Sequence, residues 1–248
     1  MKKFILSMLT IALAAVLLGS CSSKQEVYIS NSGSGNISMD VVLDDIVMEY
    51  SRDLLGGFSN TSSDQLRIFD IEKIAEIVGS LESVTLVVVS TDSPDRLHVE
   101  FNFTDPGKIL YNQFPDSIPD PIVFSKKTIN GRIRKTLEIY LSRQNFNIAA
   151  SIVGMDSSDI MDTFGPQEVP YSKEEYMDLM EYLFEEYETP SNIRRIIRES
   201  EIIIDLEIDG TVIDYSVCSV SGRNVIIRIP LLDIVTLKKP IEIFLEWE

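Results

Sequence analysis

Apolar side chains recur at every second position in several short segments of this chain, and this period most constrains its fold. Near the C-terminal end the pattern covers residues 202–208 and 241–247. Successive side chains of a β-strand point to opposite faces, so the pattern predicts strands that bury one face. The dipeptide Asn130-Gly131 separates the segments 122–129 and 132–141. Asn-Gly is the strongest short signal for a β-hairpin, so these two segments are predicted to pair.

Turn residues predict further strands on both sides of this hairpin. A turn at Ser32–Gly35 and another at Ser93–Asp95 each separate two strand-like runs, and the second hairpin is expected to be central to the sheet. The four prolines of residues 105–121 predict a surface loop, and residues 231–239 are interpreted as a connection. The other predicted strands cover residues 27–31, 37–42, 84–89, 97–103, 212–220 and 225–229.

Helical periodicity interrupts the strands. Ser172 and Glu175 have the spacing of a capping box, and Thr189-Pro190 has the composition of a helix start. Asp156, Asp159 and Asp162 are interpreted as helix-capping residues, because their spacing of three does not suit a calcium loop. The predicted helices cover residues 43–54, which Gly56-Gly57 end, about 70–79, 146–153, 172–187 and a segment from Thr189.

Together these elements predict an α+β fold. Its sheets are mainly antiparallel and built from hairpins, with helices packed on one face. The helical stretch 146–200 forms an insertion before the C-terminal strands.

The first 21 residues have the layout of a secretory signal peptide. Lys2 and Lys3 precede an apolar run from Phe4 to Leu18, and small residues and Cys21 follow. The run is shorter than the ~20 residues that a membrane-spanning helix needs. The chain is therefore predicted to be exported.

The sequence Leu18-Gly19-Ser20-Cys21 resembles the lipobox of bacterial lipoproteins. The resemblance implies cleavage by signal peptidase II before Cys21, a diacylglycerol thioether on Cys21 and acylation, for example by palmitate, of the new amino terminus. The alternative is an ordinary signal peptide with an unrelated cysteine. We therefore expect a lipoprotein signal peptide at 1–20, a lipidated short leader at 21–26 and an α+β domain at 27–248. That domain is one unit or two sub-parts, 27–145 and 146–248.

A second resemblance concerns the start of the predicted domain. A strand from Val27, the Gly33-Ser34-Gly35 turn and a second strand ending at Val42 are similar to the start of LppM-type bacterial lipoprotein domains. This resemblance covers about 25 residues, and no functional residue is carried over from it.

Charge and residue counts exclude several classes of function. The formal net charge of −17 disfavours nucleic acid as a partner and broad contact with anionic lipid. If Cys21 is lipidated, Cys218 has no disulfide partner, and it is interpreted as a buried thiol. The single histidine, His98, is predicted on the solvent side of a strand, and Trp247 at the edge of the core. No metal or cofactor is expected.

One dense basic cluster stands out in this acidic chain, at the tip of the hairpin around Asn130-Gly131. Its members are Lys126, Lys127, Arg132, Arg134 and Lys135. One hypothesis is an interaction patch for anionic headgroups or for the acidic helix 172–187. The alternative is a charged edge that discourages strand-to-strand aggregation.

No catalytic motif is found, so the leading hypothesis is a non-catalytic envelope lipoprotein, a binding or structural module. Its ligand would be an apolar molecule held between sheet and helices. The alternatives are a protein-interaction subunit of an envelope assembly and a carboxylate-based hydrolase. By resemblance to enteric lipoproteins, Ser22 after the cysteine implies the outer membrane. With a single membrane, the protein would lie on the outer face of the plasma membrane.

Overall fold

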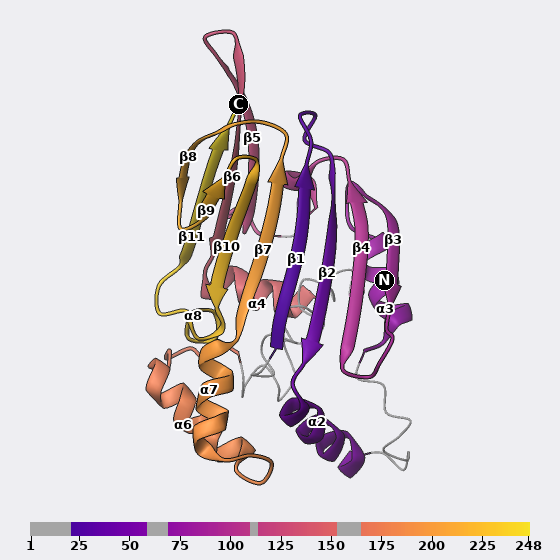
Figure 1. The fold of residues 1–248 in the computed structure, drawn as a ribbon, viewed down its shortest axis with the longest axis vertical. Helices are drawn as coiled ribbons and strands as arrows, with labels where there is room; N and C mark the ends of the chain where they lie inside the picture. The colour runs from indigo at the N-terminus through magenta and orange to yellow at the C-terminus, as the bar shows by residue number, and fades with distance from the viewer. Residues whose placement is uncertain (1–20, 59–68, 110–113, 153–164) are drawn as a thin grey trace.

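The structure is a computed structural model that describes residues 21–58, 69–109, 114–152 and 165–248. The predicted signal peptide, residues 1–20, lies outside the described residues, as do Asp156, Asp159 and Asp162. The described strands form two sheets, one of seven strands and one of four (Figure 1). The predicted α+β fold class is confirmed.

The seven-stranded sheet has the order β3-β4-β2-β1-β7-β10-β9. Its pairs are antiparallel except β1 with β7, which run parallel with Ser23 opposite Ile202. The strands are β1 (Cys21–Ile29), β2 (Gly35–Leu43), β3 (Val84–Ser90), β4 (Arg96–Phe103), β7 (Glu201–Ile208), β9 (Ser219–Ser221) and β10 (Asn224–Pro230).

The four-stranded sheet has the order β5-β6-β11-β8 and is antiparallel throughout. Its strands are β5 (Ile122–Ile129), β6 (Arg132–Leu141), β8 (Val212–Ser216) and β11 (Ile241–Trp247). Asn130 and Gly131 both have positive φ, 52° and 79°, which is the backbone of the tight hairpin turn that Asn-Gly favours. The predicted β5–β6 hairpin is therefore confirmed with its boundaries.

Both parts of the chain contribute to both sheets. β1 pairs with β7, and β6 pairs with β11, so residues 27–145 and 146–248 do not form separate sheets. The predicted strand 212–220 is wrong as a single element, because its halves β8 and β9 belong to different sheets. Val217, with a φ of 54°, turns the chain between them.

Apolar and polar side chains alternate along the strands, so one face of the seven-stranded sheet is apolar and forms part of the core. Leu97, Val99 and Phe103 of β4 are buried, and the same side of the sheet carries Ile29 and Leu206. This face packs against the four-stranded sheet and against helices α3 (Ile71–Gly79) and α4 (Arg143–Ile152) (Figure 1). Trp247 is fully buried, as its position in an alternating strand predicts.

The opposite face of the seven-stranded sheet is polar, and no helix of the described residues covers it (Figure 1). His98 lies on this face, where Nδ1 is 2.8 Å from Oδ1 of Asp40 on the neighbouring strand. The predicted solvent-side position of His98 is confirmed.

Three helices lie at the end of the sheet where β1 begins (Figure 1). They are α2 (Asp45–Phe58), α6 (Lys173–Phe184) and α7 (Pro190–Glu199). Ser172 and Glu175 form the predicted capping box of α6. Arg194 of α7 binds Glu174, Asp178 and Glu181 of α6, as expected for the acidic helix and the basic segment that follows it.

Four boundaries differ from the sequence analysis. β1 begins at Cys21, so residues 21–26, predicted as a leader, are strand residues that bond to β2 and β7 on either side. α2 continues through Gly56-Gly57. β3 is an edge strand, not a central one. Helix α8 (Leu231–Thr236) occupies most of the predicted connection, with the short helix η2 (Pro106–Lys108) in the predicted loop.

Candidate functional site

The first described residue, Cys21, opens the central strand of the large sheet. Its backbone is opposite Leu43 at the end of β2, and Ser23 is opposite Ile202 at the start of β7. α2 and α6 lie beyond this end of the sheet and contact each other through the rings of Tyr50 and Phe184, whose centroids are 5.3 Å apart. In the turn after α6, the Tyr187 hydroxyl donates to Oδ2 of Asp53 over 2.9 Å. The backbone of Cys21, the predicted lipidation site, therefore lies at the end of the sheet that faces these helices.

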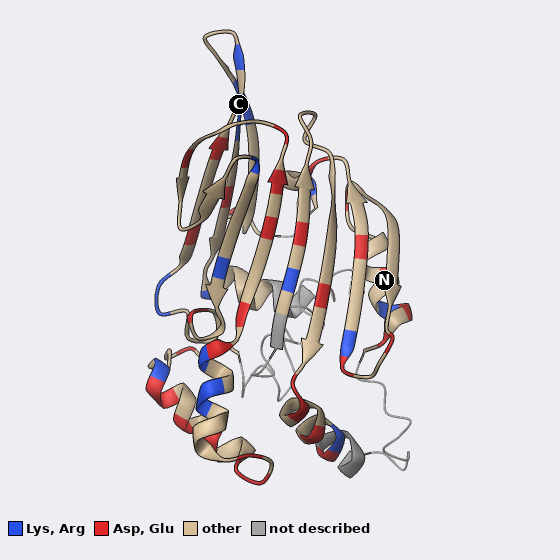
Figure 2. Cartoon of the chain, in the orientation of Figure 1, with Lys and Arg blue, Asp and Glu red and all other residues tan. Residues whose placement is uncertain are grey.

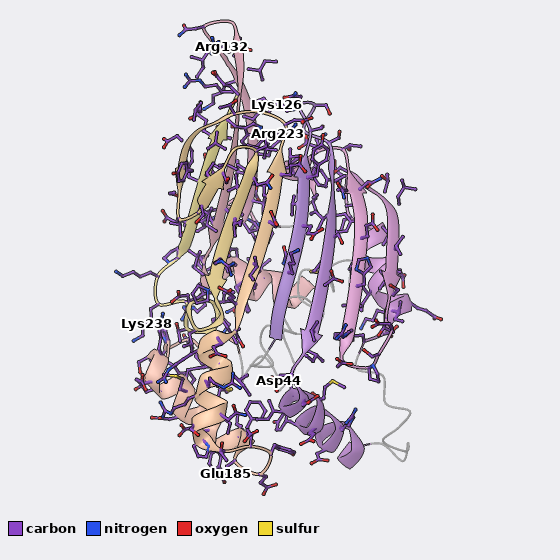
Figure 3. The ribbon with its side chains drawn as sticks, in the orientation of Figure 1. Asp44, Lys126, Arg132, Glu185, Arg223 and Lys238 are labelled. Atoms are coloured by element: carbon purple, nitrogen blue, oxygen red, sulfur yellow. The ribbon has the colours of Figure 1, made fainter. Side chains whose placement is uncertain are left out.

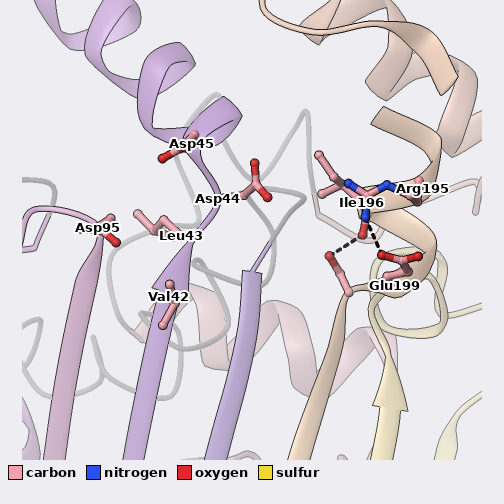
Figure 4. A pocket seen from close by; sticks show the side chains of 9 residues that line it. Val42, Leu43, Asp44, Asp45, Asp95, Arg195, Ile196 and Glu199 are labelled. Carbon is pink, nitrogen blue, oxygen red and sulfur yellow. Dashed lines mark hydrogen bonds and ion pairs between the residues drawn. The ribbon is translucent and has the colours of Figure 1, made fainter. Parts of the chain in front are cut away.

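A polar pocket of about 400 Å³, the β2–α7 pocket, lies beside the start of β1 (Figure 4). Asp95 has a lowered pKa, because the Ser93 hydroxyl hydrogen-bonds its carboxylate, with a smaller contribution from Arg96. Arg195 is bonded to Glu199 over 2.7 Å. Because the pocket lies beside the start of β1, the carboxylates that line it are at the same end of the sheet as Cys21, the predicted lipidation site. The lining residues are Val42, Leu43, Asp44, Asp45, Asp95, Arg195, Ile196, Glu199 and Ser200.

The predicted interaction patch divides between the two faces of the β5–β6 hairpin. Lys126 and Lys135 are directly opposite each other and turn toward the loop after β1. Lys126 donates to the carbonyl oxygen of Ser32, and Lys135 donates to Oδ1 of Asn31 over 2.9 Å. Burial, with a smaller contribution from Lys126, lowers the pKa of Lys135. These two lysines therefore join the two sheets.

The arginines of the hairpin bind the C-terminal strand. Arg132 is 2.7 Å from Oε1 of Glu248, and Arg134 is 3.2 Å from Oε1 of Glu246. Among the described residues Lys127 forms no salt bridge. Four of the five predicted patch residues thus contact this chain itself, which the local sequence could not indicate. A role of the hairpin in binding a partner stays a prediction.

The hairpin and Cys21 lie at opposite ends of the molecule. Asn31 and Ser32 follow the last residue of β1, which spans roughly 27 Å at ~3.3 Å per residue. Figure 3 places Arg132 at one end and Glu185, just after α6, at the other. The hypothesis that the hairpin contacts the acidic helix within one molecule is therefore wrong.

A second cavity, of about 530 Å³, opens where the two sheets part between β10 and β11. We call it the β10–β11 cleft. β10 belongs to the large sheet and β11 to the small one, and α8 connects them. The lining residues are Lys173, Val217, Arg228, Ile229, Pro230, Asp233, Thr236, Lys238, Lys239, Pro240, Ile241, Glu242 and Ile243.

The floor of the cleft is apolar and continuous with the core. Ile229 and Ile243 are buried, and each belongs to the inward face of its sheet. Val217 is 67% exposed and has a φ of 54°, which is rare for a β-branched residue. Such an exposed apolar side chain beside buried ones can contact an apolar ligand.

The rim of the cleft is basic. Lys173 is 2.5 Å from Oδ1 of Asp233, and Arg228 binds Glu201. Lys238 and Lys239 form no salt bridge within the described parts of the chain, and both are exposed. Lys238 lies near α6 in Figure 3, and its charge adds a small contribution to the lowered pKa of Glu175, which is due mainly to hydrogen bonds from Ser172. The rim therefore retains positive charge.

Cys218 follows Val217 at the corner between the sheets. Burial raises the pKa of its thiol, which makes the thiolate scarce and the residue a poor nucleophile. Cys218 is half-buried and not fully buried as predicted, and among the described residues its thiol is free.

The fold is similar to that of a solved protein domain. No family model and no curated protein matches the chain. The structure is similar to the NMR structure of the folded domain of Mycobacterium tuberculosis LppM, with a TM-score of 0.39 and 9% sequence identity. The match covers 92% of this chain and 90% of that chain. None of the described helices is long and apolar enough to cross a membrane, and the described residues contain no metal-binding group of His, Cys, Asp and Glu.

No local sequence pattern indicates the β10–β11 cleft as a whole. Its residues come from α6, the β8–β9 corner, β10 and the α8–β11 connection, which are far apart in the sequence. The one local signal for this cleft is the basic dipeptide Lys238-Lys239, which is followed by Pro240 in an otherwise acidic chain.

Proposed function

We propose that this chain is a lipid-anchored envelope protein whose domain is a non-catalytic module that holds an apolar ligand in the β10–β11 cleft. The observation that carries the proposal is an apolar floor that continues into the core, with Ile229 and Ile243 buried beside the exposed Val217. A concave site of ~300–1,000 Å³ with apolar walls is the usual form of a small-molecule site.

The anchor and the cleft lie at the same end of the large sheet. Ser23 is opposite Ile202, and Ile202 is opposite Ile229. Two spacings of ~4.8 Å put the backbone of Ile229 about 10 Å from that of Ser23. A molecule that leaves the bilayer near an acylated Cys21 would therefore lie close to the cleft.

The anchor is tested by mass spectrometry of the full-length chain extracted from membranes. We expect cleavage before Cys21, acyl groups on residue 21 and an unmodified Cys218. Cys21→Ala should leave the precursor uncleaved. An unacylated Cys21 in the wild-type protein would contradict this part of the proposal.

The ligand site is tested with a photoreactive fatty acid and the full-length chain in phosphatidylcholine vesicles. We expect cross-links in the segments that contain Val217, Ile229 and Ile243. Val217→Asp should reduce the labelling, because it puts a carboxylate at the mouth of the cleft and Asp tolerates a positive φ. The control is Val169→Asp, at a valine that is 82% exposed and does not line the cleft. Equal labelling of both variants would contradict the proposed site.

A second candidate function is that of an interaction subunit, favoured by the edge strand β3. Leu86 is 75% exposed there, beside Val88 at 51%. A bulge between Thr85 and Val88 interrupts the ladder, so a partner would contact the side chains rather than add a strand. In-cell cross-linking should then give a defined adduct that Leu86→Lys removes and Val169→Lys keeps.

A further inference from the structure

We propose that the ligand of the β10–β11 cleft is a single-chain amphiphile from the membrane with an anionic headgroup, which the basic rim binds. This inference rests on the proposed function of the cleft. It adds the chemical class of the ligand and the residues that select it, Lys238 and Lys239 above all.

The charge of the rim runs against the charge of the protein. Of the thirteen lining residues four are cationic and two are acidic, in a chain with a net charge of −17. The α8–β11 connection forms a basic segment beside the acidic α6 (Figure 2). A chain with this many acidic residues does not need extra lysines for solubility. The cationic residues that line this apolar cleft therefore favour a negatively charged ligand.

Two of the four cations form salt bridges, and two do not, although the charge of Lys238 also acts on Glu175 of α6. Lys173 is bound to Asp233, and Arg228 is bound to Glu201. Lys238 and Lys239 make neither a salt bridge nor a side-chain hydrogen bond within the described residues. A phosphate or carboxylate at the mouth of the cleft can therefore bind these two without breaking an existing ion pair.

The backbone around the two lysines is held in place. Leu237 is buried and ends α8 with a φ of 34°, and its N–H donates to the carbonyl oxygen of Asp233. Pro240 follows the lysines and restricts its own φ, and Ile241 begins β11. The lysines are thus presented between a buried anchor and a paired strand, so less chain entropy is lost when they bind an anion.

The floor and the rim together select an amphiphile. A free anion would leave Val217 and Ile241 in water, and a neutral hydrocarbon would leave the lysines unused. A cavity of about 530 Å³ is within the range that holds one small molecule, which favours a single acyl chain.

The test uses the full-length chain in phosphatidylcholine vesicles and follows alkylation of Cys218, the thiol next to Val217, at an alkaline pH that forms the thiolate. Dodecyl phosphate, dodecanol and inorganic phosphate are added separately, and the modified peptide is quantified by mass spectrometry. Dodecyl phosphate should slow alkylation at a concentration about tenfold below that of dodecanol, the effect of one charge-assisted hydrogen bond. Inorganic phosphate should give no protection.

Variants assign the effect to the rim. The double variant Lys238→Gln, Lys239→Gln should lose the preference for dodecyl phosphate and keep the weaker protection by dodecanol. Lys127→Gln, at the opposite end of the molecule, is the matched control and should behave as the wild type. Thermal unfolding of each variant shows whether the fold is retained.

Each other outcome contradicts a defined part of the argument. Equal protection by dodecanol and dodecyl phosphate would overturn the inference about the headgroup and leave the proposed apolar site intact. Protection by inorganic phosphate alone would show an anion site and overturn the amphiphile. No protection by any of the three would overturn the proposed function as well.

Discussion

The ammonium group of Lys135 donates a hydrogen bond to Oδ1 of Asn31 over 2.9 Å, and this bond joins the four-stranded sheet to the loop between β1 and β2. Lys135 is only 3% exposed, although it belongs to the hairpin that the sequence presents as a charged tip. The sandwich is therefore held at this end by a buried lysine, at the other end of β1 from Cys21.

Lys135→Met should leave the free energy of unfolding at neutral pH unchanged or higher, because a buried charge is replaced by an apolar chain. Lys135→Ala should be less stable than Lys135→Met by about 2 kcal/mol through lost packing. Urea unfolding measures both, and a Lys135→Met protein clearly less stable than the wild type would contradict this prediction.

The same lysine predicts a pH dependence. Its folded-state pKa lies below the usual 10.5, so the unfolded chain binds more protons. The wild type should therefore gain stability relative to Lys135→Met as pH rises from the folded-state pKa to the usual value. The two proteins share all their other titratable groups. The difference between their free energies of unfolding therefore reports the contribution of Lys135 alone.

Gly35→Ala should disrupt the first hairpin. A Cβ at this position would lie 1.7 Å from the carbonyl oxygen of Tyr28 and 2.7 Å from the ring of Phe103. We expect a loss of about 3 kcal/mol, because backbone must move. The control is Gly79→Ala at the end of α3, where a Cβ meets nothing within 4 Å, with a gain of about 0.5 kcal/mol. Similar urea midpoints for the two variants would contradict the close approach at Gly35.

Tyr187→Phe should change the alkaline stability of the contact between α2 and the turn after α6. Burial, with the hydrogen bond to Asp53, raises the pKa of Tyr187 to about 12. A raised folded-state pKa stabilises the fold below the usual value of 10, and this contribution is lost as pH rises from 10 to 12. The wild type should therefore lose stability relative to Tyr187→Phe in this window. Tyr182→Phe, at a tyrosine that is 71% exposed, serves as the control in the same titration.

Arg194→Met should loosen α7 from α6. The guanidinium of Arg194 contacts three carboxylates of α6 and is itself mostly covered, with 23% of its side chain exposed. The urea midpoint should fall, and the difference from the wild type should shrink at high salt because the exposed carboxylates are screened. Arg195→Met removes the exposed pair with Glu199 and the exposed hydrogen bonds to Asn192, and should have a smaller effect. A larger effect for Arg195→Met would contradict the assignment.

Local patterns explain which elements were predicted correctly. Asn130-Gly131 strongly favours the positive φ values of a tight hairpin turn, so it predicts the hairpin and its register without knowledge of the rest of the chain. Asp70 and Ser172 are also local signals, and they predict helix starts. The side chain of each accepts a hydrogen bond from the backbone N–H three residues later.

The hairpin cations show where local patterns fail. Their number and spacing indicate a basic patch, but a strand alternates its faces, and their partners Asn31, Ser32, Glu246 and Glu248 come from other parts of the chain. The β10–β11 cleft is missed for the same reason, because its floor and its rim come from different sheets and helices.

The sequence by itself determined the α+β class, most of the strands and helices, and the exposed position of His98, because each depends on periodicity, turn residues or caps within a few positions. Only the tertiary structure decided that β1 begins at Cys21 and runs parallel to β7, that residues 212–220 divide between two sheets, and that Lys238 and Lys239 stand at an apolar cleft. The physical reason is that these features depend on contacts between residues far apart in the chain, such as Ser23 with Ile202, and no local pattern encodes them.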